Sequence, residues 1–70
     1  MEPSEIFELI VKADERLKYA TDERGEQRRQ QARDLLVLAK AEAEAIGNQP
    51  LVDQAERRLA DIEALGDPGA

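Results

Sequence analysis

Hydrophobic residues recur every three or four positions along this chain, in three segments separated by polar stretches. This spacing gathers apolar side chains on one side of an α-helix. No segment alternates apolar and polar residues with the period of two that a half-buried β-strand shows. The pattern predicts an all-α fold, a small three-helix unit with helices over about 4–21, 26–46 and 50–65 and a tail at 66–70.

The first segment opens with a helix start signal at Pro3 and Ser4, and Glu5 complements the positive end of the helix dipole. Its apolar residues occupy one broad side of the helix. We expect this side to be buried through Ile6, Phe7, Leu9, Ile10, Ala13, Leu17 and Ala20.

Residues 21–31 carry no apolar side chain. We expect a turn near Asp22–Gly25 that folds the first two helices into a hairpin, because their apolar sides must be buried by something. The alternative is one long helix that runs straight through this stretch, since Glu, Gln and Arg are good helix formers.

The second segment has more apolar residues than a single buried side requires. Its main side consists of Ala32, Leu35, Leu36, Ala39, Ala43 and Ile46. A second set lies nearly opposite: Val37, Leu38, Ala41 and Ala45. A middle helix with two neighbours on one side leaves this second set uncovered, so we predict that it forms an oligomer or partner interface. The alternative is harmless exposure, because scattered apolar residues are normal on protein surfaces.

Gly47 and Asn48 end the second helix, with Gly47 suited to the left-handed position that follows a helix. Pro50 then marks the first turn of the third helix. A single side of that helix is apolar and is predicted to be buried: Leu51, Val52, Ala55, Leu59, Ile62 and Leu65.

Composition limits the classes of function. Seventy residues make one small domain, 1–70, with no Cys for disulfides and no His, the commonest general base and metal ligand. The net charge of −6 disfavours nucleic-acid binding. No apolar run approaches the roughly 20 residues of a membrane span. We therefore expect a cytoplasmic protein, and seven Arg against three Lys suggest a bacterial source.

The acidic residues form no recognisable catalytic or metal-binding motif. Glu42 and Glu44 are two residues apart and diverge around a helix, and no Gly-rich phosphate loop or calcium loop is present. We expect no enzymatic activity, no cofactor, no metal site and no small-molecule substrate.

One basic cluster stands out in this acidic chain: Arg24, Arg28, Arg29 and Arg33. Guanidinium groups match carboxylates, so the cluster could receive an acidic partner segment. The alternative is ion pairing with acids of a neighbouring helix, for which the candidates are Asp14, Glu15, Asp22 and Glu23.

Two helices share a small-x3-large-x2-small spacing, at Ala32, Leu36 and Ala39 and again at Ala55, Leu59 and Ile62. With Gly47 between helices and Asp67–Pro68 after the last one, this resembles tetratricopeptide repeats. Lys40 stands where that pattern has a small residue. The resemblance implies a helical-hairpin scaffold for protein interaction. Three-helix bundles of the microtubule-interacting-and-transport type resemble the chain as well, in residue pattern and in length.

These observations predict a non-catalytic protein–protein interaction module that self-associates, as a homodimer or a larger oligomer, or docks a partner helix or peptide. One alternative is a regulatory subunit or adaptor that uses the arginine cluster. Another is a fragment of a longer helical-repeat array.

Overall fold

A computed structural model of the chain describes residues 1–18 and 25–65. It consists of three helices, α1 at Pro3–Lys18, α2 at Gly25–Ala45 and α3 at Gln49–Leu65, and the described residues include no strand. The predicted all-α fold is confirmed. Each helix begins one residue earlier than predicted, and α2 also ends one residue earlier. The expected helical residues 19–21 and the tail at 66–70 lie outside the described part of the chain.

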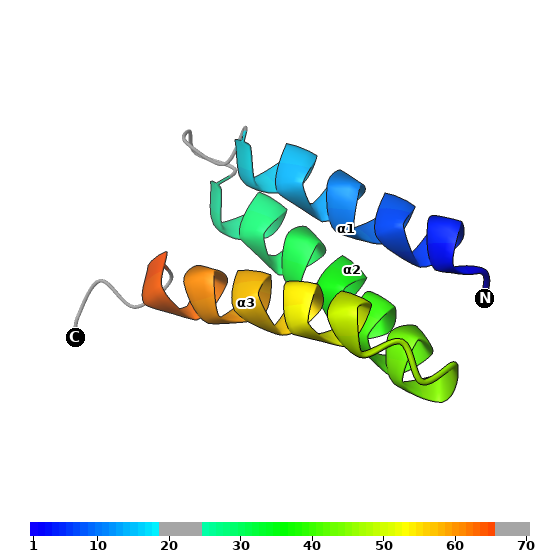
Figure 1. The fold of residues 1–70 in the computed structure, drawn as a ribbon. Helices are drawn as coiled ribbons and strands as arrows, with labels where there is room; N and C mark the ends of the chain where they lie inside the picture. Colours follow the sequence, from blue (N-terminus) through cyan, green and yellow to red (C-terminus); the bar gives the residue numbers. More distant parts are fainter. Residues whose placement is uncertain (19–24, 66–70) are drawn as a thin grey trace.

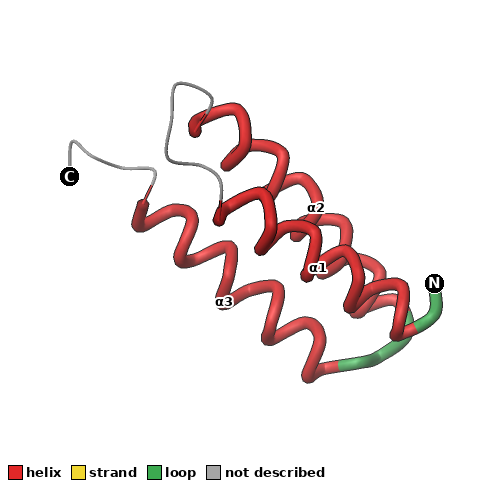
Figure 2. Tube along the Cα trace, turned by 90° about the horizontal axis from the view of Figure 1, so that it is seen from above, coloured by secondary structure: helices red, strands yellow, loops and turns green. Residues whose placement is uncertain are grey.

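The helix α2 is the centre of the molecule. Both α1 and α3 pack along it, whereas α1 and α3 touch each other only slightly (Figures 1 and 2). Because α1 packs back along α2, the hairpin prediction is correct and a single long helix is excluded. Gly25, which we expected in the turn, is instead the buried first residue of α2. Glycine is well accepted at a helix N-terminus.

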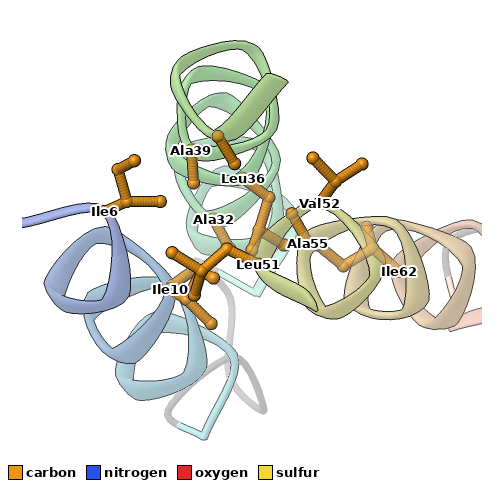
Figure 3. Close-up of a cluster of buried hydrophobic side chains, with 11 residues drawn as sticks. Ile6, Ile10, Ala32, Leu36, Ala39, Leu51, Val52, Ala55 and Ile62 are labelled. Atoms are coloured by element: carbon orange, nitrogen blue, oxygen red, sulfur yellow. The ribbon is translucent and has the colours of Figure 1, made fainter. Parts of the chain in front are cut away.

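The core lies where the three helices face one another (Figure 3). Leu36 of α2 is fully buried, as are Ile6 and Ile10 of α1. Leu9, Leu17, Leu35 and Leu59 pack around this core and are partly buried. The remaining buried hydrophobic residues, all of them predicted, are Ala13, Ala32, Ala39, Ala43, Leu51, Val52, Ala55 and Ile62.

Two residues predicted to be buried are not. Phe7 is 49% exposed and Ile46 is 42% exposed. Successive residues point about 100° apart around a helix, so Phe7 lies at the margin of the side that Ile6 buries. Ile46 follows the last residue of α2 and sits in the turn, where the helical periodicity no longer directs its side chain. Ala20 and the side chain of Leu65 lie outside the described part of the chain.

A compact turn sets α3 antiparallel to α2. The Gly47 N–H donates to the Glu44 carbonyl at 3.1 Å, and the Asn48 N–H donates to the Ala43 carbonyl at 2.9 Å. Gly47 has a φ of +68°, as the sequence predicts, and this pair of bonds is the Schellman motif. Asn48 also starts α3, because its side-chain oxygen accepts the Leu51 N–H at 3.3 Å.

Glu2, rather than Ser4, caps the start of α1. Its carbonyl accepts the N–H groups of Glu5 and Ile6 at 3.0 and 3.1 Å. The Glu5 side chain reaches back and accepts the Glu2 N–H at 3.0 Å. This arrangement leaves Pro3 as the first helical residue, where its lack of an N–H costs nothing.

Candidate functional site

The second apolar set on α2 is exposed to solvent. Val37 is 53% exposed and Leu38 is 43% exposed, and Ala41 and Ala45 are also exposed. We call these four residues the outer face of α2.

The opposite side of α2 and both of its edges are in contact with the rest of the chain. Leu36 faces the core, and Leu38 lies two residues further on, about 200° around the helix. On one edge, Glu42 is 3.8 Å from the N-terminal ammonium group that precedes α1. On the other edge, Lys40 Nζ lies 3.4 Å from Glu56 Oε1 of α3. The outer face is therefore the side of α2 turned away from both neighbouring helices.

Polar groups limit the outer face along its length. One turn before Val37, the Gln30 side-chain amide donates to Asp34 Oδ1 at 3.1 Å. At the other end, Ala45 is the last helical residue. The face spans just over two turns, about 12 Å along the axis. Its bulky residues stand at one end and its alanines at the other.

The structure thus places all four predicted interface residues on one exposed side of one helix. Their contact with a partner stays a prediction. The arrangement can bury apolar surface against another helix, and the two alanines would let such a helix approach closely.

Three members of the arginine cluster, Arg28, Arg29 and Arg33, lie in the N-terminal half of α2. This half is at the same end of the molecule as the last turns of α1 and α3 (Figure 1). Arg24 is outside the described part of the chain, and Arg28, Arg29 and Arg33 are partly buried. Arginines beside helix C-termini complement the negative end of the helix dipole. This placement favours the structural role over partner recognition, and both roles stay predictions.

The ion pair seen for the cluster differs from those expected. Arg33 Nη2 lies 3.9 Å from Glu63 Oε1 on α3, whereas Asp14 is bound by Arg58. The sequence could not indicate this pairing, because it depends on the register between α2 and α3. Asp22 and Glu23 lie outside the described residues. Arg28 Nε is enclosed and finds no hydrogen-bond partner among the described residues.

A second exposed apolar area was missed at the sequence level. Phe7 and Val11 are one turn apart on α1, and Val11 is 37% exposed. Further exposed apolar residues, Met1 and Ile46, line a shallow hollow at the end of the molecule together with Pro3 and Pro50. The available signal was the width of the predicted face of α1, because two neighbouring helices cannot bury so broad a side.

Within residues 1–18 and 25–65, no three acidic side chains come together in a way that could hold a metal ion. None of the described helices is both long enough and apolar enough to cross a membrane.

We compared the chain with protein-family models, with curated proteins and with solved structures. No family model, no curated protein and no solved structure matches it.

Proposed function

We propose that this protein is a non-catalytic interaction module that binds another helix on the outer face of α2, and that it self-associates as a homodimer through this face. A single observation carries the proposal: Val37 and Leu38 project from α2 on the side opposite its core contacts, with Ala41 and Ala45 beside them. The resemblance to tetratricopeptide repeats supports the same class of function. The absence of Cys favours a reducing compartment, so we also propose the cytoplasm.

The energetics of a small domain support self-association. The buried side of α2 is built mainly from alanine, with Leu36 as its only large fully buried residue. Small domains with thin cores are often stabilised by oligomerisation. Burial of a few hundred Å² of apolar surface, at about 25 cal/mol per Å², would contribute several kcal/mol before the entropic cost of association.

The solution mass tests the proposal. Light scattering from about 10 µM to about 500 µM should show a concentration-dependent shift from monomer to dimer. The Leu38→Glu, Ala41→Glu double variant should remain monomeric over the whole range, because each dimer would bury four unpaired carboxylates.

A matched control separates this site from a general effect of charge. Phe7→Glu with Ala64→Glu also replaces one large apolar residue and one alanine by Glu, at exposed positions on α1 and α3. We expect this variant to dimerise like the wild type. A wild-type chain that is monomeric at all concentrations, or a control variant that loses the dimer equally, would refute the proposal.

A further inference from the structure

We propose that the two copies pair antiparallel through the outer face of α2, with a two-fold axis beside Ala41. This inference rests on the proposed function and adds the orientation and register of the partner helix. In this register each residue before Ala41 lies opposite the residue equally far after it. Val37 of one copy then lies opposite Ala45 of the second copy, and Ala41 lies opposite itself.

The distribution of side-chain size along the face favours this orientation. The bulky residues, Val37 and Leu38, occupy its first turn and the alanines occupy the rest. An antiparallel pair places Val37 of each copy over Ala45 of the other, and it keeps the two Leu38 side chains apart. A parallel pair would place Leu38 against Leu38 and leave a gap between facing alanines, and such voids lose packing contacts.

Charge favours the same orientation. In a parallel pair in register, Asp34 of each copy would lie opposite Asp34 of the other, and Glu44 opposite Glu44. Like charges that face one another across an interface oppose association. In the antiparallel register Asp34 lies opposite the neutral Asn48, and Glu44 lies opposite Leu38 at the edge of the contact. Antiparallel helix dipoles add a small favourable contribution.

The fold leaves room for this contact. Both α1 and α3 pack on the core side of α2, and the ion pairs of Glu42 and Lys40 lie at its edges. The second copy therefore meets one projecting helix along about 12 Å. Such a contact is smaller than the roughly 1,200–2,000 Å² that stable complexes bury. We therefore expect a dissociation constant in the micromolar range or weaker.

Disulfide trapping tests the register directly, because the chain contains no Cys. Three single variants are compared in a glutathione redox buffer: Ala41→Cys, Ala45→Cys and, as a control on the exposed side of α3, Ala64→Cys. Cysteines form a disulfide when their Cα atoms are within about 7 Å. Residue 41 lies beside the two-fold axis, whereas the two copies of residue 45 are separated by about 12 Å along the helix direction.

We expect Ala41→Cys to form a dimer at least about tenfold faster than Ala64→Cys, and Ala45→Cys to match the control. A mixture of Val37→Cys and Ala45→Cys should form the mixed disulfide in preference to either homodimer. Circular dichroism of the reduced variants confirms that all of them fold.

The outcomes separate the two proposals. Self-crosslinking of Ala45→Cys as fast as that of Ala41→Cys would show a parallel pair, which overturns the register and leaves the proposed dimer intact. Control-level rates for every variant, together with a monomeric mass in light scattering, would overturn both.

Discussion

Arg58 of α3 donates from Nε to both carboxylate oxygens of Asp14 on α1, at 2.8 and 3.0 Å, across a sequence separation of 44 residues. The same guanidinium donates from Nη1 to the Gln54 carbonyl at 3.2 Å, which holds it in place on α3. Since α1 and α3 otherwise touch only slightly, the Arg58–Asp14 ion pair is one of the main contacts between them.

Removing this ion pair should lower the free energy of unfolding only slightly, by an amount that depends on salt concentration. The Asp14 side chain is 46% exposed, and exposed ion pairs contribute about 0.2–1 kcal/mol. We expect a double-mutant cycle of Asp14→Asn and Arg58→Gln, measured by urea unfolding, to give a coupling energy of about 0.5 kcal/mol. The coupling should shrink in high salt. A coupling of zero at low salt would show that the observed geometry does not stabilise the fold.

Two leucines on α2 should respond oppositely to the same substitution. Leu36→Asp places an unpaired charge in the fully buried core, so we expect loss of the folded state by circular dichroism at 25 °C. Leu38→Asp, at an exposed position two residues further on, is the matched control. At a concentration where the chain is monomeric, it should change the free energy of unfolding by less than about 0.5 kcal/mol. A folded Leu36→Asp variant would refute the core assignment.

Gly47→Ala should destabilise the protein through the backbone alone. The residue has φ +68°, and a Cβ added there meets no atom within 4 Å. The cost is then the left-handed conformation itself, about 1–2 kcal/mol, measured as a lower midpoint of urea unfolding. Gly47→Asn should cost less, because asparagine tolerates this conformation better. Equal losses for both variants would contradict this explanation.

Charge reversal at the arginine cluster distinguishes its two roles. Arg28→Glu should lower the melting temperature more than Arg29→Glu, because Arg28 Nε is enclosed and a carboxylate there would be partly desolvated. Arg28→Gln, which removes the charge and keeps a polar side chain, should fall between Arg28→Glu and the wild type. Neither reversal should abolish dimerisation. If the double variant Arg28→Glu, Arg29→Glu left the melting temperature unchanged but removed binding of an acidic partner, the cluster would be a recognition site instead.

Much of the fold could be predicted from local rules. The helical spacing of apolar residues identified three helices, and Gly47 with Asn48 identified the turn between α2 and α3, because both signals act over a few neighbouring residues. The sequence alone also distinguished the two apolar sides of α2. Leu36 and Leu38 belong to opposite sides by helix geometry alone.

Which side of each helix is covered, and how fully, depended on the tertiary structure. The sequence assigned Phe7 to the buried side, yet α2 and α3 together cover a narrower arc of α1 and leave it half exposed. The ion pairs that link Arg33 with Glu63 and Arg58 with Asp14 were equally hidden, since they depend on the register between helices that are far apart in sequence. Local spacing determines which way a side chain points from its own helix. Only the packing of the helices decides what, if anything, it meets there.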